Sequence, residues 1–408
     1  MSFIGYCWII SVNLTADLQP IMIKARPHLL TLSLLAGTYI LVQVIIVPSL
    51  TDLQEQFKTD YKTIQYTISG YLLGVAFVNF IAGPLSDRFG RRPIMLAFFS
   101  IFFVSSLGCY ISSDLNSFLF FRLCQSSSAA GLVLSRAIIG DFSSKDETVK
   151  MLGLLSIAMG IAPSLAPLAG GIINDYFGSR GIFLFLTFLS LFLLTLIMID
   201  LKETHFHRSK DIFSQIKTYP TLITSLDFWL PTSTFALSFS IFGIFFIGGP
   251  YVAVKVFNLS PTVMGICLSF PALGYVLGNI LVSKTANIVS TKNLMVLGSG
   301  ILFLGPCFSL LLSNFYFHPL SFFLPILIMT FGSGIIWPAA NAEIVKAIPH
   351  LAGSASGLGS AIMTLMSSFA AFLTGIYIEY LNPIDFVCYL LIFVGVLSFF
   401  SSLCTRSK

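Results

Sequence analysis

Long apolar stretches without acidic or basic residues follow one another along almost the whole chain. They cover residues 27–51, 63–86, 93–113, 151–174, 181–199, 228–254, 256–283, 293–342, 347–378 and 386–405. A helix needs about 20 apolar residues to cross the roughly 30 Å hydrocarbon core of a bilayer, so each stretch is long enough to span it. The stretch 293–342 has room for two spans, divided at Asn314, His318 and Pro319.

One further span is predicted over residues 117–140, where only Arg122 and Arg136 interrupt the apolar pattern. We therefore expect twelve transmembrane helices. Their predicted starts lie near Leu29, Ile64, Ile94, Ser117, Met151, Gly181, Trp229, Pro261, Asn293, Leu320, Ala352 and Phe386.

The composition agrees with a membrane protein. Of the 408 residues, 56% are apolar and 10% are charged, whereas about a quarter of a soluble domain is charged. A transmembrane β-barrel would show alternating segments of about 10 residues. The expected fold class is therefore an all-α integral membrane protein. The seven cysteines lack the spacing of a metal or redox site, so we predict no bound metal.

Lysine and arginine predict the orientation. If the N-terminus is cytoplasmic, the outer connections hold only Lys58, Lys62, Arg180 and Lys255, and most other basic residues fall in inner connections. Cytoplasmic loops are enriched in Lys and Arg. We expect both termini to be cytoplasmic in a bacterial-type inner membrane. The net charge of +5 follows from this bias and needs no nucleic-acid partner.

The charged segment 202–227 divides the predicted spans into two groups of six. We expect a flexible N-terminal extension over 1–27, six-helix halves over 28–201 and 228–405, and a cytoplasmic tail over 406–408. The halves open about 200 residues apart, as in transporters built from parallel repeats.

A short charged loop, GPLSDRFGRRP over residues 83–93, follows the second predicted helix. Gly83 and Gly90 permit close backbone approach and positive φ. Asp87 can pair with Arg91 or cap a helix N-terminus, a contact that breaks when two rigid halves rock. The alternative is a positive-inside turn without a gating role. The remaining cations of this predicted gating loop are Arg88 and Arg92.

The fourth predicted helix carries two arginines on the face shared by Gln125 and Ser126. Charge inside a span is costly and usually faces a bundle interior or an aqueous cavity. We favour a cavity-facing Arg122 over one that snorkels to the outer interface. For Arg136 we favour a structural network with Asp87 or Asp141 over substrate contact.

The fifth predicted helix contains several helix-breaking and small residues. Pro163 and Pro167 remove amide donors, while Gly160, Gly170 and Gly171 allow a neighbouring helix to approach closely. A bent, closely packed helix suits an exporter gate, although a purely structural kink is the alternative.

These motifs together resemble a known family. GPLSDRFGRRP resembles the loop signature of the major facilitator superfamily. RLCQSSSAAGLVLSRAIIGDF (122–142) and IAPSLAPLAGG (161–171) are similar to the fourth and fifth helices of its Bcr/CflA-type drug:proton antiporters. Looser matches in the second half are GGPYVAVKVFNLSP (248–261), GSGIIWPAANA (332–342) and AGSASGL (352–358).

The resemblance implies a twelve-helix secondary transporter that exports drugs or toxic compounds by alternating access. It implies no cofactor, and a proton gradient as the energy source. The expected partners are a small-molecule substrate and the lipid bilayer, with no obligate protein partner. By family position and polarity, the expected substrate cavity is lined by Tyr39, Gln43, Tyr71, Arg122, Gln125, Ser126, Phe242, Trp337 and Asn341.

The sequence departs from this family at one important position. Such exporters usually carry an Asp four residues before a proline of the first helix, but Val44 stands four residues before Pro48. All 17 acidic residues fall in predicted loops or at helix ends. Ser179 also replaces a residue that is usually Trp in the family. Two explanations remain open. Either proton coupling uses Arg122 and acids at helix ends, such as Asp87 or Asp141, or the substrate is neutral or anionic.

Two other functions compete with export. A transporter of the same fold could import or carry an anionic or zwitterionic solute held by Arg122. A membrane enzyme such as a lipid-linked transferase would need paired acids or a His/Asp centre, and the acids here are scattered singly. We therefore expect a transporter and no enzyme.

Overall fold

The protein is helical throughout the part of the chain that the computed structural model describes, residues 26–142, 145–204, 219–285, 288–347 and 352–405. Nearly all of the predicted N-terminal extension, most of the 202–227 connection and the 406–408 tail lie outside these ranges. The division into those segments stays a prediction.

The first group of helices runs from residue 29 to residue 200. Its elements are α2 (Leu29–Val44), η1 (Val47–Ser49), α3 (Leu50–Gln56), α4 (Tyr61–Ile64), α5 (Tyr66–Phe89), α6 (Arg91–Ile111), α7 (Leu115–Cys124), η2 (Gln125–Ala129), α8 (Ala130–Phe142) and α9 (Lys145–Asp200).

The second group begins after the connection. Its elements are α10 (Tyr219–Ile223), α11 (Leu226–Tyr251), η4 (Val252–Val256), α12 (Pro261–Thr285), α13 (Thr291–Phe315), α14 (Pro319–Phe323), α15 (Ile326–Ala347), α16 (Ala352–Tyr377) and α17 (Pro383–Cys404).

The number of membrane spans depends on how α9 is divided. The described residues contain 11 helices long and apolar enough to cross a bilayer. Within α9, Gly178 has a non-helical backbone with φ 67°, which favours glycine because a side chain is strained there. Residues 145–177 and 179–200 are therefore two successive helices, and the predicted twelve-helix fold is confirmed.

Several helices begin one to three residues before their predicted starts, because a capping side chain fixes the first turn. Asp60 and Asp114 each accept a hydrogen bond from the backbone N–H three residues on, at 2.9 Å. Backbone N–H groups of a first turn have no partner inside the helix, so such caps stabilise it. Hydrogen bonding from Ser117 lowers the pKa of Asp114. Equivalent caps are Ser290, His318 and Asn382.

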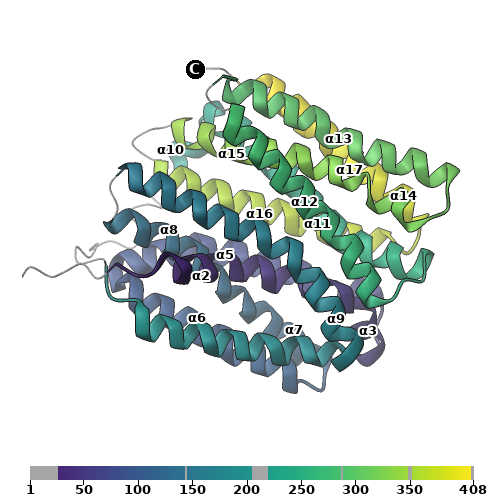
Figure 1. Cartoon of the computed structure of the whole chain (residues 1–408), viewed down its shortest axis with the longest axis horizontal. Helices are drawn as coiled ribbons and strands as arrows, with labels where there is room; N and C mark the ends of the chain where they lie inside the picture. Colours follow the sequence, from purple (N-terminus) through teal and green to yellow (C-terminus); the bar gives the residue numbers. More distant parts are fainter. Residues whose placement is uncertain (1–25, 143–144, 205–218, 286–287, 348–351, 406–408) are drawn as a thin grey trace, which may run out of the picture.

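The two groups of helices lie side by side with their axes nearly aligned. In Figure 1 the purple-to-teal helices α2–α9 occupy the lower part of the view and the green-to-yellow helices α11–α17 the upper part. Contact between the groups runs along two helix pairs, α9 with α12 and α5 with α16. We call the two groups the first half and the second half.

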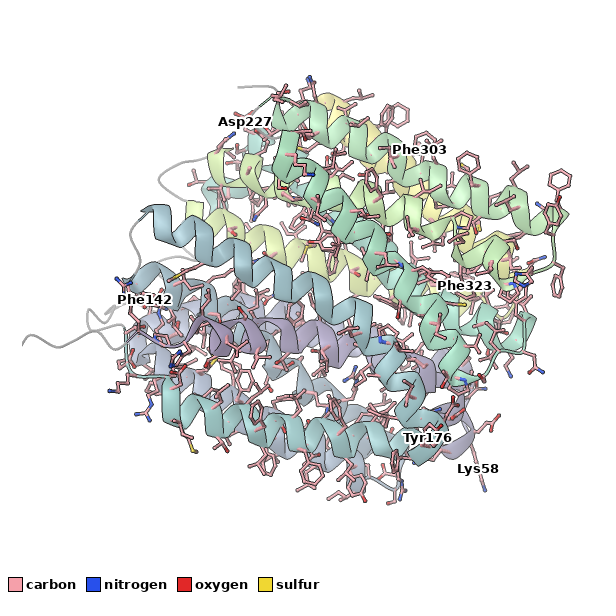
Figure 2. All side chains as sticks on the ribbon, in the orientation of Figure 1. Lys58, Phe142, Tyr176, Asp227, Phe303 and Phe323 are labelled. Carbon is pink, nitrogen blue, oxygen red and sulfur yellow. The ribbon has the colours of Figure 1, made fainter. Side chains whose placement is uncertain are left out.

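The molecule has two ends, which we name by their residues. Figure 2 shows Phe142 and Asp227 at one end, which we call the basic end, and Lys58 and Tyr176 at the other, which we call the closed end. Hydrogen bonds between the halves gather toward the closed end: the Tyr61 hydroxyl donates to the Ile247 carbonyl at 2.7 Å, and the Ser368 hydroxyl to the Ser69 carbonyl at 2.7 Å.

Candidate functional site: an aromatic cavity between the halves

A cavity of about 490 Å³, including its open mouth, lies between the two halves. Helices α2, α11, α12 and α15 line it, so both halves contribute to its wall. The lining residues are Ile40, Gln43, Val44, Phe239, Phe242, Phe246, Ala272, Tyr275 and Trp337.

Aromatic rings form most of the second half's wall. The Trp337 ring centroid lies 4.7 Å from that of Tyr275, 5.0 Å from Phe239 and 5.4 Å from Phe242. Residues 239, 242 and 246 of α11 share one helix face because of their three- and four-residue spacing. The indole nitrogen of Trp337 is buried without a hydrogen-bond partner among the described residues. It is available to a ligand with an acceptor atom.

The polar part of the wall is an uncharged amide. Gln43 on α2 is 3% exposed and stands beside Val44, which also lines the cavity. None of the lining residues is acidic or basic. Of the nine residues predicted to line a substrate cavity, Gln43, Phe242 and Trp337 are among those that do.

Arg122 lies in a separate, buried cluster inside the first half, where each guanidinium nitrogen has an acceptor. Its side chain is 1% exposed. Its guanidinium donates to the Thr67 carbonyl at 3.1 Å, the Val42 carbonyl at 2.9 Å and Gln125 Oε1 at 2.8 Å. The α2 carbonyls near Val44 lack partners in their own helix, and Arg122 satisfies one of them. The side chain neither snorkels to a surface nor belongs to the cavity lining.

The other predicted cavity residues of the first half surround this arginine. The Arg122 guanidinium carbon lies 4.4 Å from the Tyr71 ring centroid, and the Tyr71 hydroxyl donates to the Tyr39 carbonyl at 2.8 Å. Ser126 packs so closely on α5 that a Cβ at Gly74 would lie 2.3 Å from its Oγ. Tyr71, Gln125 and Ser126 thus belong to this interior cluster, which Tyr39 contacts through its backbone carbonyl. Tyr39 and Asn341 on α15 are likewise not among the cavity-lining residues.

The predicted gating loop forms an ion-pair network at the basic end. Arg91 Nη1 donates to Asp87 Oδ1 and to Ser86 Oγ, both at 2.5 Å, and Arg91 Nε donates to Asp141 Oδ2 at 3.0 Å. The predicted pairing of Asp87 with Arg91 is present. The expected pairing of Arg136 with Asp87 or Asp141 is not seen among the described residues, because Arg91 occupies both carboxylates.

Glu203, which was not among the residues predicted from the sequence, completes this network. Its carboxylate accepts the backbone N–H of Arg91 at 2.9 Å and that of Arg92 at 3.3 Å, at the N-terminus of α6. Gly90 has φ 103°, and a Cβ there would lie 2.4 Å from Glu203 Oε2. The sequence offered one signal for this role, an acidic residue three positions after the end of α9. A carboxylate placed there can bind the N-terminus of another helix, because helix N-termini favour negative charge.

The remaining loop residues have minor roles. Arg88 is exposed and stacks on the Phe89 ring at 5.3 Å, and Arg92 Nη2 donates to the Met198 carbonyl at 3.2 Å. A Cβ at Gly83 would lie 4.0 Å from Val133, so this glycine allows ordinary contact and does not require closer approach.

The fifth-helix residues lie where the two halves touch. A Cβ on Gly171 would lie 2.5 Å from the Pro261 carbonyl, and one on Gly265 would lie 2.5 Å from the Pro167 carbonyl. Within the first half, a Cβ on Gly170 would lie 1.9 Å from the carbonyl of Ile45, the residue that follows α2. The predicted close approach of a neighbour is thus present at Gly170 and Gly171. The packing of Gly160 and Pro163 lies outside what the structure describes.

No metal centre is evident in the described ranges, where no three His, Cys, Asp or Glu side chains lie together as metal ligands would. The Ser179 hydroxyl, at the position where Trp is usual, donates to Gln56 Oε1 at 2.8 Å. Asn174 donates to Asp52 nearby at 2.5 Å. These contacts hold α9, on both sides of Gly178, to α3 at the closed end.

Comparison with known proteins places this geometry in a family. The family model described as Major Facilitator Superfamily matches residues 32–371. A relative, the MFS-type transporter YdgK of Bacillus subtilis, is 26% identical over 359 residues, covering 86% of this chain and 89% of its own. The bicyclomycin resistance protein homolog of Haemophilus influenzae is 24% identical over 366 residues, covering 86% and 90%.

Other similarities are shorter or structural. Multidrug resistance protein D of Escherichia coli is 30% identical over 159 residues, which is 39% of this chain and 40% of its own. Among solved structures, the D-xylose-proton symporter superposes with a TM-score of 0.74 at 15% identity, covering 93% of this chain and 97% of that one. An inward-facing bacterial homolog of the lysosomal transporter Spinster gives 0.70 at 12% identity, covering 93% and 98%.

Proposed function

We propose that this chain, which belongs to the Major Facilitator Superfamily, exports small, mostly apolar compounds by alternating access. The observation that carries the proposal is the uncharged aromatic cavity between the two halves. A wall of aromatic rings with one amide favours flat apolar molecules and offers no carboxylate to attract a cation. Membership of this family makes the protein a transporter and not an enzyme.

The arrangement of the two ends supports access of a substrate to the cavity from one side of the membrane. Toward the closed end, hydrogen bonds and glycine contacts hold the halves together, as at Tyr61 with Ile247 and at Gly171 with Pro261. The concentration of Lys and Arg in the other set of connections assigns the basic end to the cytoplasm. A compound would then enter from the cytoplasm, and opening of the closed end would release it outside.

Names of the relatives support export as the direction. Two of them are called a bicyclomycin resistance protein homolog and a multidrug resistance protein, and resistance by a transporter implies removal of the compound from the cell. We therefore place this chain in a bacterial-type cytoplasmic membrane with both termini inside. The alternative of a carrier with an anionic solute on Arg122 loses support, because protein acceptors already take hydrogen bonds from that guanidinium.

A proton gradient is the proposed energy source. The cavity wall contains no carboxylate, so the proposed coupling groups are acids of the basic end, Asp87, Asp141 and Glu203. These carboxylates contact Arg91 through its side chain or backbone. The contact between such a carboxylate and Arg91 can change when the two halves rock. The proton occupancy of the carboxylate would change with it.

Everted membrane vesicles test the proposed function. With the neutral fluorescent amine N-phenyl-1-naphthylamine as probe, we expect energised vesicles to accumulate it and a protonophore to abolish accumulation. Trp337→Leu should reduce the rate several-fold because it removes the central ring of the cavity. Trp229→Leu is the matched control, since Trp229 bonds to the Ile223 carbonyl away from the cavity. Absence of energised accumulation, or equal effects of both substitutions, would contradict the proposal.

A further inference from the structure

Gln43, near the C-terminal end of α2, carries an amide that has no hydrogen-bond partner in the described part of the chain. The residue is only 3% exposed. Buried polar side chains are nearly always hydrogen-bonded, and an unpaired one costs free energy. An amide that stays unpaired at this depth is therefore a candidate for hydrogen bonding to a ligand.

The small surface that Gln43 keeps faces the cavity between the halves. Gln43 is one of the residues that line this cavity, and neither of its amide atoms is among the unpartnered polar atoms that the described protein seals completely. Gln65 shows the contrast, because its Oε1 is sealed and its side chain fills the space beside Gly375 of the other half. A ligand in the cavity can reach the amide of Gln43 but not Gln65 Oε1.

The backbone around Gln43 is held in place on both sides. The carbonyl of Val42, the preceding residue, accepts a hydrogen bond from the Arg122 guanidinium at 2.9 Å. The carbonyl of Ile45, two residues further on, packs so closely on Gly170 that a Cβ would not fit there. Because these contacts fix the end of α2, binding to the amide requires little ordering of the protein.

A flat molecule that binds Gln43 would meet the aromatic rings of the second half. Trp337 lies at the centre of these rings, with its centroid 4.7 Å from that of Tyr275 and 5.4 Å from that of Phe242. Helices α12 and α15 touch through their backbones at this level, since a Cβ at Gly334 would overlap the Tyr275 carbonyl. The cavity therefore combines a fixed apolar surface for the face of a ring with an amide for its edge.

We propose that Gln43 selects flat, uncharged lactams, which carry a hydrogen-bond donor and an acceptor on neighbouring ring atoms. The lactam carbonyl accepts a hydrogen bond from Gln43 Nε2 and the lactam N–H donates to Gln43 Oε1, while the ring lies against Trp337 and Phe242. The proposal rests on the proposed function, since it takes the aromatic cavity as the substrate site, and it adds the class of substrate that this site prefers.

The chemistry of the carboxamide decides between classes of ligand. A carboxamide presents a C=O acceptor and an N–H donor side by side in one plane. A lactam presents the complementary pair, so two parallel hydrogen bonds form, as they do between Gln and the edge of adenine. An ion would be buried without a countercharge, because the lining holds no acidic or basic residue. A hydrocarbon would fit the rings but would leave the amide unpaired.

Binding to the purified full-length protein tests the proposal with two probes that differ at one atom of the lactam edge. Quinolin-2-one carries the free N–H, and 1-methylquinolin-2-one carries a methyl group in its place. Calorimetry should give at least about tenfold tighter binding of quinolin-2-one, because the methylated probe loses one hydrogen bond and keeps Gln43 Oε1 unpaired. Gln43→Met, which keeps the length of the side chain without its amide, should abolish this preference.

Controls separate recognition by the amide from effects on folding. Gln43→Met should not lower the thermal unfolding midpoint, since the amide has no protein partner to lose. Gln54→Met removes an amide of α3 outside the cavity lining and should leave the preference unchanged. Tyr275→Phe removes a hydroxyl from the lining but keeps the ring, and it should also leave the preference unchanged. Equal affinities of the two probes for the wild type would overturn the proposal, as would a preference that persists in Gln43→Met.

The proposed function fails in a different way. If both probes bind equally and Trp337→Leu weakens both, the cavity stands as the substrate site and only the lactam preference is wrong. If quinolin-2-one binds with the expected dependence on Gln43 but energised vesicles accumulate no substrate, the lactam site stands and export is wrong.

Discussion

Arg122 and Arg136 lie about 20 Å apart along the fourth span, at a helical rise of 1.5 Å per residue, and their surroundings are opposite. Arg122 is enclosed and its donors are taken by Val42, Thr67 and Gln125. Arg136 has no such acceptors among the described residues and is only half-buried. The first residue therefore joins α2, α5 and the end of α7 into one unit, and the second makes no comparable contact in the described part of the chain.

Removing Arg122 should destabilise the protein. Arg122→Ala leaves buried acceptors unsatisfied and deletes a fully packed side chain, at a cost of about 3 kcal/mol. We expect a clearly lower thermal unfolding midpoint for the purified variant, and a smaller decrease for Arg122→Lys, which keeps the charge but not the planar fork. An unchanged midpoint for Arg122→Ala would show that the cluster is not structural.

The two acids on Arg91 allow a matched pair of substitutions. Asp87→Asn should lower the transport rate several-fold with normal membrane insertion, because it weakens the Arg91 contact within the gating loop. Asp141→Asn should also lower the unfolding midpoint, because Asp141 additionally accepts the Thr204 hydroxyl at 3.0 Å. Transport in vesicles and insertion by membrane fractionation measure the first effect. Full transport by Asp87→Asn would remove its role in the gate.

At the scale of elements, glycines set the distance between α9 and α12. Gly171 and Gly265 each face a carbonyl of the other helix, and any side chain at either position would overlap it. Backbone contact of this kind permits close helix packing in membranes. A hydrogen bond from the Thr262 N–H to Asp175, at 3.0 Å, joins the same two helices.

Gly171→Ala should therefore open the closed end. The added methyl group meets the Pro261 carbonyl, so the α9–α12 contact must widen and the population should shift away from the state described here. Disulfide formation between cysteines placed at Asp175 and Thr262, in an otherwise cysteine-free background, should fall markedly. Gly70→Ala is the control, since nothing lies within 4 Å of its added Cβ. Equal crosslinking in both variants would refute the prediction.

At the scale of the whole molecule, the two halves form a pair of bundles whose closed and basic ends differ (Figure 1). Their contact through α9 with α12 and α5 with α16 leaves the aromatic cavity between them. Transport requires the two ends of the protein to open in turn. The orientation of the protein in the membrane therefore decides whether the described state takes up its substrate from the cytoplasm or from the outer side.

Cysteine labelling measures that orientation. We expect a membrane-impermeant maleimide to modify Lys58→Cys on intact cells, and Lys284→Cys only after permeabilisation, because the basic end should face the cytoplasm. Both positions are exposed or half-buried at a helix end, so local burial does not prevent labelling. The reverse pattern would invert the proposed direction of transport.

Much of the fold could be predicted from the sequence. Charge-free stretches located the spans because a bilayer tolerates only apolar helices of sufficient length. Helix starts shifted where a cap such as Asp60 or Asn382 preceded the apolar residues. The Asp87–Arg91 pair was also predictable, because the residues lie four apart at a helix end.

The candidate site was predicted less completely, since partners far apart in sequence decide it. Glu203 lies 112 residues from Arg91, and the cavity wall combines Gln43 of the first half with Trp337 of the second. The sequence pattern places Arg122 and Arg136 on one helix face. It does not show which of the two guanidinium groups has hydrogen-bond acceptors.

The sequence by itself determined the helices, the uneven distribution of positive charge and the absence of an acid before Pro48. These are local properties, set by hydrophobic length and residue type. Only the tertiary structure decided which arginine is held by acceptors on other helices, which rings enclose the cavity and which end is closed. Those features depend on backbone carbonyls and side chains brought together from distant helices, and no local pattern in the chain specifies that meeting.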